Sequence, residues 1–309
     1  TFSIYQYFNL LLQKKTDMEK GAYTLLITPF REDRSIDEEA LRRLVRRQME
    51  STITGIAPLG TTGENSLLSD EEVIRVLEIV VDETGGRKPV LPDLCLSGTR
   101  ESIDRAKRFA DAGADFVVAF SPYLALPRPE GLLGYYEDLA DASPVPLVLH
   151  SSKGRTGVEL SPEMTARLAQ HPNIVATKDG KKEIDHLAKI IYLTRNDDFL
   201  VFTGKDTTAY PMVAFGGAGS FTVAGNVVPD VMSDMILAAL DGDHDKARKI
   251  HNEYYPLYEA LRFETNPMAA KMALELMGLI HGTVRPPLTP LSPQKTQLLK
   301  DILQEKGLL

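Results

Sequence analysis

Residues 173–179 read NIVATKD, and this stretch decides how the surrounding sequence is interpreted. Ile174, Val175 and Ala176 form a short apolar run between His171-Pro172 and Gly180, which is typical of a buried strand that ends on Lys178. An ammonium group there is costly to desolvate, and burial usually lowers the pKa of a lysine. A neutral amine can attack a ketone, so the stretch indicates Schiff-base chemistry at Lys178. The alternative is a solvated strand tip at which the lysine has no chemical role.

Seven more apolar runs have the same character, and amphipathic stretches separate them. They span residues 23–28, 55–59, 90–94, 116–120, 147–150, 200–203 and 219–223. Asp37, Ser69 and Ser161-Pro162 are suitable starts for helices between the runs. Eight strand–helix units predict an α/β fold, a (β/α)8 TIM barrel over residues 21–228. A doubly wound sheet is the alternative, but it needs a glycine-rich loop where this sequence has Thr28-Pro29-Phe30.

The two ends of the chain differ from this alternating pattern. Residues 229–309 contain only helical patterns separated by Gly, Pro and Asn, so we expect a C-terminal helical subdomain packed on the barrel. Residues 1–20 form an N-terminal arm, in which we expect an accessory helix. The arm lacks the basic start and long apolar segment of a signal peptide or membrane span.

Composition favours a small-molecule partner and a cytoplasmic location. The formal net charge is −8 and no Lys/Arg run exceeds two residues, which argues against nucleic acid. The single cysteine, Cys95, excludes an internal disulfide framework and suits a reducing compartment. The six histidines form no close pair at ligand spacing, so we expect no metal and no cofactor.

In a TIM barrel the residues that follow each strand carry the function. The second run is followed by GTTGEN, in which Gly60, Thr61 and Thr62 can direct backbone N–H groups at a carboxylate. A tight turn with a helix cap is the structural alternative. Tyr123 follows the fourth run, where it is either a binding residue or a tyrosine at the rim.

The later strand ends contribute further candidates. His150 ends the fifth run, and Arg155 lies in the loop after it, where a guanidinium could bind a carboxylate in bidentate fashion. A lone arginine in a loop is otherwise a surface residue. Gly204-Lys205-Asp206 and the glycine-rich stretch around Thr222 indicate close backbone approach near the barrel mouth.

Several of these segments together resemble a known family. They are GTTGE at 60–64, SPY at 121–123, GRTG at 154–157, NIVATKD, FTGKD at 202–206, TNPMAAK at 265–271 and RPPLTPL at 285–291. Their order and spacing are similar to those of the dihydrodipicolinate synthase and N-acetylneuraminate lyase family over roughly residues 21 to 300. The resemblance implies a metal-free class I aldolase in which Lys178 forms a Schiff base with pyruvate or another 2-oxo acid. It also implies that Thr61 and Thr62 hold the carboxylate, and that the chain forms a homotetramer, a dimer of dimers.

Two positions depart from the family pattern. The family has a tyrosine where this chain has His150, and the synthases have a second tyrosine where Leu124 follows Tyr123. Of the synthase's proton relay, only Thr61 is matched. We therefore expect His150 to carry the proton, with a reference pKa near 6.5 that would make activity respond to neutral pH. The alternative is that His150 is only a polar residue hydrogen-bonded to a loop, and that water or a substrate hydroxyl moves the proton.

These observations predict a Schiff-base lyase that cleaves or condenses a 2-oxo acid and an aldehyde through a pyruvate enamine. A 2-keto-3-deoxy sugar acid is the substrate class we favour, and a dehydratase could use the same imine. The alternatives are dihydrodipicolinate synthase itself and, from another class, a non-catalytic 2-oxo acid binding protein.

Overall fold

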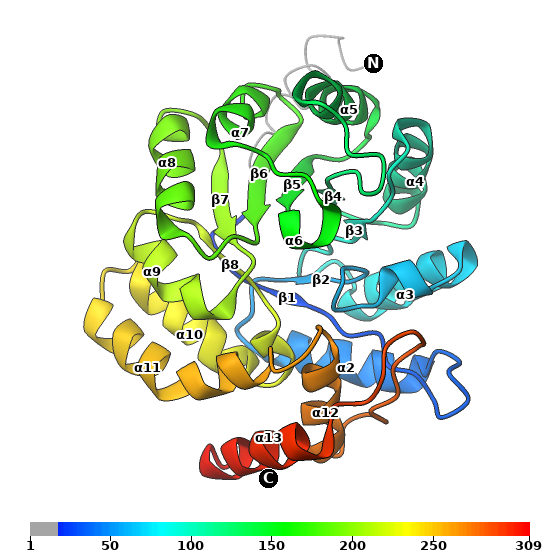
Figure 1. The fold of residues 1–309 in the computed structure, drawn as a ribbon, viewed down its shortest axis with the longest axis vertical. Coiled ribbons are helices and arrows are strands. Elements are labelled where there is room, and N and C mark those ends of the chain that lie inside the picture. Colours follow the sequence, from blue (N-terminus) through cyan, green and yellow to red (C-terminus); the bar gives the residue numbers. More distant parts are fainter. Residues whose placement is uncertain (1–17) are drawn as a thin grey trace.

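A computed structural model describes residues 18–309, and its eight strands form one parallel sheet. The sheet order is β2-β1-β8-β7-β6-β5-β4-β3, with helices around the outside (Figure 1). The accessory helix expected in the N-terminal arm falls on residues outside the described part. The strands are β1 (Gly21–Leu25), β2 (Gly55–Ala57), β3 (Asp93–Leu94), β4 (Val117–Phe120), β5 (Leu147–Ser151), β6 (Ile174–Asp179), β7 (Leu200–Thr203) and β8 (Gly219–Thr222).

Main-chain hydrogen bonds close the sheet between β2 and β3. An isolated parallel bridge pairs Ile56 with Val90. The Leu91 N–H donates to the Ile56 carbonyl at 2.9 Å, and the Asp93 N–H donates to the Pro58 carbonyl at 3.0 Å. The sheet thus returns on itself as a (β/α)8 barrel, which confirms the predicted fold, and each predicted run overlaps one strand.

The helices begin where their capping residues predict. The side chain of Asp37 accepts a hydrogen bond from Ala40 N, Ser69 forms a capping box with Glu72, and Ser161 accepts from Met164 N. The barrel helices are α2 (Glu38–Glu50), α3 (Asp70–Thr84), α4 (Thr99–Asp111), α5 (Pro129–Ala142), α6 (Lys153–Thr156), α7 (Pro162–Leu168), α8 (Ile184–Thr194), α9 (Ala209–Ala214) and α10 (Pro229–Leu240). Short 3₁₀ turns η2 (Asn65–Leu67), η3 (Asp206–Thr208) and η4 (Ala224–Asn226) follow β2, β7 and β8.

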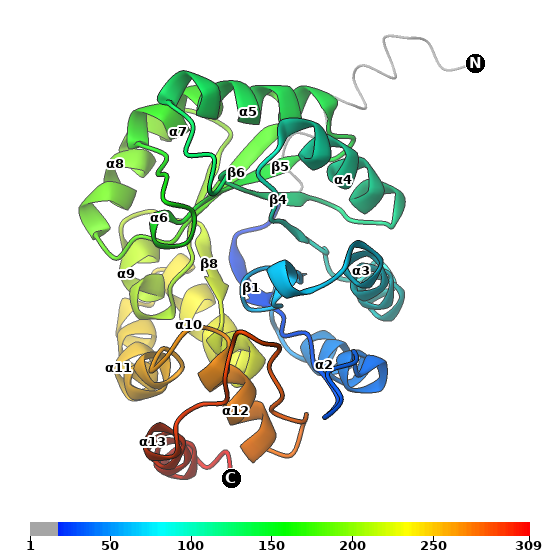
Figure 2. The same cartoon turned by 45° about the vertical axis from the view of Figure 1, so that its right-hand side comes forward.

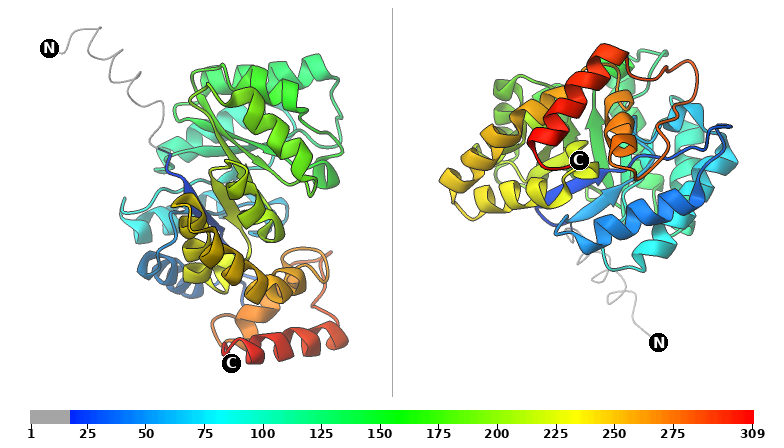
Figure 3. Two further views of the ribbon diagram at one scale, coloured as in Figure 1. Left: turned by 90° about the vertical axis from the view of Figure 1, so that its left-hand side faces the viewer. Right: turned by 90° about the horizontal axis from the view of Figure 1, so that it is seen from below.

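The C-terminal part is helical, as predicted. It consists of α11 (His244–Ala260), α12 (Met268–Leu276) and α13 (Pro293–Glu305). Helices α12 and α13 lie beyond the side of the barrel formed by α2 and α10 (Figure 2), and α13 contacts both α11 and α12 (Figure 3). Helix α10 packs on β1 and β8, so the boundary between barrel and helical part that we propose falls after Leu240 instead of at 228/229.

Three aromatic rings fill the barrel interior below its carboxyl end. Tyr23 on β1, Phe202 on β7 and Phe221 on β8 are fully buried, with ring centroids 5.1 to 5.5 Å apart. Their edge-to-face and stacked contacts give the barrel a solid apolar floor. None of the helices between residues 18 and 309 combines the length and apolar character that crossing a bilayer requires.

Candidate active site

The register of the parallel strands places Lys178 next to His150. His150 on β5 pairs with Lys178 on β6, and Phe120 on β4 pairs with His150. Side chains in register on adjacent strands point to the same face, here the barrel interior. Lys178 Nζ lies 3.4 Å from His150 Nδ1 and 5.2 Å from the centroid of the Phe221 ring beneath it. Burial of the strand-end lysine, inferred from NIVATKD, is thus confirmed, with 3% of Lys178 exposed.

Asp93 completes a triangle with these two residues. Its Oδ2 lies 3.2 Å from Lys178 Nζ and 3.4 Å from His150 Nδ1, and its side chain is fully buried. Asp93 reaches this position from β3, on the far side of β4 and β5 in sheet order. A buried amine therefore faces one carboxylate and one imidazole at hydrogen-bonding range.

The electrostatics of the triangle keep His150 neutral. Burial, followed by the positive charge of Lys178, lowers the pKa of His150 to about 4. Burial alone would raise the pKa of Asp93, but the nearby Lys178 and His150 lower it on balance. The expected response of His150 to neutral pH is therefore wrong, because an imidazole with this pKa titrates in the acidic range.

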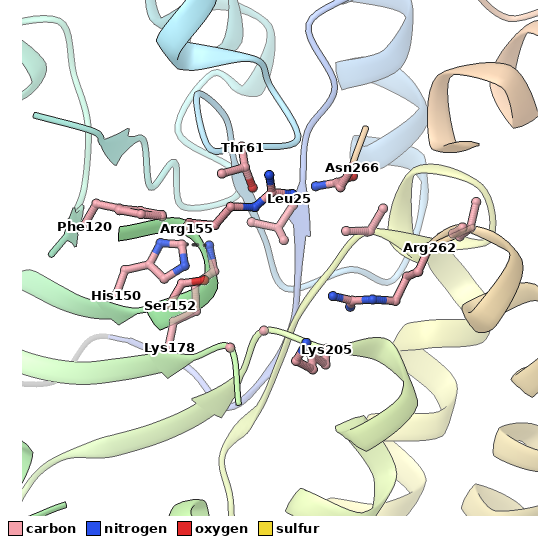
Figure 4. Close-up of a pocket in the computed structure, with 14 residues that line it drawn as sticks. Leu25, Thr61, Phe120, His150, Ser152, Arg155, Lys178, Lys205, Arg262 and Asn266 are labelled. Carbon is pink, nitrogen blue, oxygen red and sulfur yellow. Dashed lines mark hydrogen bonds between the residues drawn. The ribbon is translucent and has the colours of Figure 1, made fainter. Parts of the chain in front are cut away.

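These residues open into a cavity of about 90 Å³ at the carboxyl end of the strands (Figure 4). Thr61, Phe120, His150, Arg155 and Lys178 line it, so four of the predicted site residues meet in one place. An adjoining pocket of about 260 Å³ shares Thr61, Phe120 and Arg155 with the cavity and adds Gly60 and Tyr123.

The turn after β2 gives the cavity one polar wall. Its internal hydrogen bonds run from Glu64 N to the Thr61 carbonyl and from Asn65 N to the Gly60 carbonyl. These bonds do not use the N–H groups of Thr61 and Thr62, which leaves them for an anion. Gly60 is needed for packing, because a Cβ at this position would lie 2.5 Å from Asp93 Oδ2.

The structure does not bring every predicted side chain to the cavity. The Thr62 hydroxyl is buried and accepts a hydrogen bond from Asn266 Nδ2 at 2.9 Å. Thr222 follows Phe221 on β8, so strand alternation turns it to the outer face of the barrel, where its hydroxyl accepts from Gly225 N at 3.0 Å. Substrate contact by the Thr222 side chain is therefore not supported, because its orientation leads away from the cavity.

Tyr123 is held at the edge of the adjoining pocket by its backbone. Its N–H donates to Ser97 Oγ at 3.0 Å, and Ser97 Oγ donates to its carbonyl at 2.6 Å. Arg155 lies on the short helix α6 at the rim of both pockets. Both residues therefore lie where the outer part of a bound molecule would extend.

Sequence reasoning missed three charged residues of the site. An available signal for Asp93 was a carboxylate inside the apolar run 90–94, at the end of the third strand. Lys205 lay in a segment recognised only for close backbone approach. Arg262 follows α11 and also lines the cavity, but no local sequence pattern indicated that it belongs to the site.

Residues 18–309 contain no group of three or more His, Cys, Asp or Glu side chains that could hold a metal ion. The polar groups of the cavity are instead an amine, an imidazole, a carboxylate, hydroxyls and guanidinium groups. An amine among such groups can bind and activate a small organic acid.

Comparison with protein families places the chain. The model of the dihydrodipicolinate synthetase family matches residues 18–306. The chain belongs to this family. The resemblance to a family of aldolase-type lyases, noted in the sequence, is thus confirmed.

Individual relatives in the family are similar over almost the whole chain. The 4-hydroxy-tetrahydrodipicolinate synthase of Methanosarcina barkeri is 41% identical over 292 residues, which cover 94% of this chain and all of the relative. The dihydrodipicolinate synthase of Acinetobacter baumannii, solved in complex with pyruvate, has a TM-score of 0.92 at 34% identity and covers 94% of this chain and all of that one. A prophage protein of the family from E. coli K12, also solved with pyruvate, has a TM-score of 0.89 at 28% identity, with coverages of 94% and 99%.

Proposed function

We propose that Lys178 forms a Schiff base with pyruvate or a related 2-oxo acid, and that the chain is a metal-independent lyase acting through the resulting enamine. The observation that supports this most directly is a buried amine at the bottom of a cavity, 3.2 Å from the carboxylate of Asp93. Pyruvate is the 2-oxo acid present in two similar structures of the family. The 2-oxo acid carboxylate would accept hydrogen bonds from the Thr61 hydroxyl and the N–H groups of Thr61 and Thr62.

The chemistry follows from the groups around Lys178. Its amine attacks the ketone carbon, and the resulting carbinolamine takes up a proton and loses its hydroxyl as water, which leaves a protonated iminium. Asp93 faces that nitrogen, so its negative charge stabilises the iminium. Loss of a proton from C3 gives the enamine, which adds to an aldehyde carbon while the aldehyde oxygen takes up a proton. Water then hydrolyses the iminium and frees Lys178.

His150 has a positioning role in this scheme. A pKa of about 4 makes its imidazole a weak base that does not retain a proton at neutral pH. Its Nδ1 lies 3.4 Å from both Lys178 Nζ and Asp93 Oδ2, so the neutral imidazole can hold either group in place by a hydrogen bond.

Two reactions are compatible with these residues, and the relatives support the one that the sequence analysis gave as the alternative. Proteins about 40% identical are named 4-hydroxy-tetrahydrodipicolinate synthase, so condensation of pyruvate with aspartate semialdehyde is the first candidate. Aldol cleavage of a 2-keto-3-deoxy sugar acid is the second. It is favoured by His150 and by Leu124, whose side chain is 87% exposed and carries no hydroxyl. A homotetramer and a cytoplasmic location stay predictions.

Reductive trapping tests the proposal. Pyruvate with borohydride should add one reduced adduct per chain, on Lys178, read by intact mass and peptide mapping. Lys178→Arg should abolish the adduct, because a guanidinium stays protonated. Lys181→Arg is the matched control, since Lys181 pairs with Glu159 outside the cavity. An adduct that survives Lys178→Arg would overturn the assignment. Trapping without turnover on any aldehyde would identify a 2-oxo acid binding protein.

A further inference from the structure

Three cationic side chains converge on the mouth of the cavity from separate parts of the chain. Arg155 lies on α6 after β5, Lys205 follows β7, and Arg262 follows α11. In Figure 4 the guanidinium of Arg262 extends into the cavity toward Lys205. Within residues 18–309, no carboxylate lies within ion-pair distance of any of the three, although the chain as a whole is acidic.

The three charges influence one another. Burial, and then the positive charges of Arg262 and Lys182, lower the pKa of Lys205 to about 8. Burial and the same Arg262 also lower the pKa of Arg155. The nearby acids Glu183 and Asp179 offset only part of this repulsion at Lys205. Asp179 is hydrogen-bonded to His186 and to the backbone of Lys181, and Glu183 lies at the start of α8.

Concentrated like charge around a cavity is unfavourable until an anion neutralises it. The cations lie at the mouth, whereas Lys178 lies at the bottom with 3% of its surface exposed. A 2-oxo acid bound to Lys178 would have its own carboxylate at the turn after β2. The three cations would therefore contact the outer end of the second substrate, the aldehyde.

We infer that the aldehyde partner carries an anionic group, a phosphate or a second carboxylate, at the end remote from its carbonyl, and no ammonium beside it. The inference rests on the proposed Schiff-base function, and it favours an aldehyde other than aspartate semialdehyde, the candidate that the relatives' names suggest. Arg155 and Arg262 supply paired N–H donors to such a group, and Lys205 supplies a compact charge. An ammonium next to the anion would meet the same cations and be repelled.

Condensation kinetics with matched aldehydes test this inference. With pyruvate saturating, kcat/KM is measured for glyceraldehyde 3-phosphate, glyceraldehyde, succinic semialdehyde and aspartate semialdehyde. The phosphorylated aldehyde should exceed its uncharged partner by on the order of 10²-fold, since more than one charge-assisted hydrogen bond is gained. Succinic semialdehyde should exceed aspartate semialdehyde, and comparing it with the phosphate identifies which anion the site prefers.

Variants of the cationic residues test whether they cause the preference for an anionic aldehyde. Lys205→Gln and Arg262→Gln should each lower kcat/KM for the anionic aldehyde by about 10- to 100-fold, the loss expected for one charge-assisted hydrogen bond. The loss of kcat/KM with glyceraldehyde should be smaller in both variants than the loss with the anionic aldehyde. Arg248→Gln is the matched control, because Arg248 is exposed on α11 and pairs with Asp245.

Each outcome decides between the two proposals. If no pyruvate adduct forms on Lys178, the Schiff-base function itself fails. If the adduct forms but charged and uncharged aldehydes react equally, the inference fails alone. It also fails if aspartate semialdehyde is the best substrate, or if Lys205→Gln and Arg262→Gln slow all aldehydes by the same factor.

Discussion

The buried position of Lys178 is stabilised by its polar neighbours. A buried ammonium without a partner would be strongly destabilising, and Asp93 supplies the opposite charge at 3.2 Å. The same carboxylate would face the iminium after the amine has reacted, so one contact serves both the resting protein and the intermediate. His150 adds a second polar neighbour while staying uncharged.

Removing the charge of Asp93 tests that dual role. Asp93→Asn keeps the shape but leaves the iminium without its counter-ion, so the rate of pyruvate trapping should fall by on the order of 10²-fold. The measurement is the single-turnover rate of borohydride-trapped adduct, with thermal unfolding recorded in parallel. An unchanged trapping rate in a folded variant would show that Asp93 is only a structural partner of Lys178.

The lowered pKa of His150 predicts how stability depends on pH. Its pKa is about 4 in the folded chain against 6.5 in the unfolded chain, so the unfolded state binds more protons between these values. The contribution of His150 to stability is therefore full above pH 6.5 and is lost as pH falls toward 4, by about 2 kcal/mol from pH 7 to 5. Urea unfolding at both pH values measures it. His150→Phe should show a correspondingly smaller loss, and an equal loss in the variant would contradict the assignment.

At the scale of the elements, the turn after β2 packs closely against the strand β3. The Asp93 carboxylate passes so close to Gly60 that no side chain fits there. The turn thus has two functions, since it presents N–H groups to the cavity and leaves room for the carboxylate behind them. Glycine at this position is a packing requirement and not a matter of backbone freedom.

A methyl group at Gly60 should push Asp93 away from Lys178. We expect Gly60→Ala to cost about 1–3 kcal/mol of stability, as overpacking usually does, and to lower kcat/KM at least tenfold. Gly134→Ala is the control, because a Cβ at Gly134 on α5 meets nothing within 4 Å and alanine favours a helix. Chemical denaturation and steady-state kinetics on both variants give the comparison. Full activity of Gly60→Ala would mean that Asp93 can move without consequence.

The barrel and much of the site could be predicted from sequence, and the failures have physical reasons. Apolar runs and helix caps are local signals, so the strands and helices were found, and the strand-end rule then located Lys178, His150 and Thr61. The contact between Asp93 and Lys178 joins residues that are far apart in the chain, and it forms only when the strands assemble into the barrel. The orientation of the Thr222 side chain could not be predicted, because the face on which it lies depends on the register of β8. The pKa of His150 could not be predicted either, because it depends on burial by residues from other strands.

At the scale of the whole molecule, a buried ion pair joins the barrel to the C-terminal helices. Lys271 on α12 lies 2.5 Å from Glu64 in the turn after β2, and both side chains are fully buried. Lys271 Nζ also donates to the Thr283 carbonyl at 2.8 Å, and Arg285 N donates to Glu64. The segments TNPMAAK and RPPLTPL thus meet the site turn at one point.

Breaking this pair should loosen the attachment of the helical part. Lys271→Met leaves the Glu64 carboxylate buried without its cation, which typically costs about 3–5 kcal/mol. The double variant Glu64→Gln with Lys271→Met removes both charges and should be more stable than Lys271→Met alone. Guanidinium unfolding of the two variants tests this order. If the double variant is the less stable of the two, the ion pair is not the main interaction at this junction.

The aromatic floor formed by Tyr23, Phe202 and Phe221 has a kinetic consequence. Because the rings close the barrel beneath Lys178, the cavity is a dead end, and both reactants must pass through the same mouth. An aldehyde that arrives before the 2-oxo acid occupies this route to the amine. Excess aldehyde should therefore act as its own inhibitor, and raising the concentration of the 2-oxo acid should relieve that inhibition.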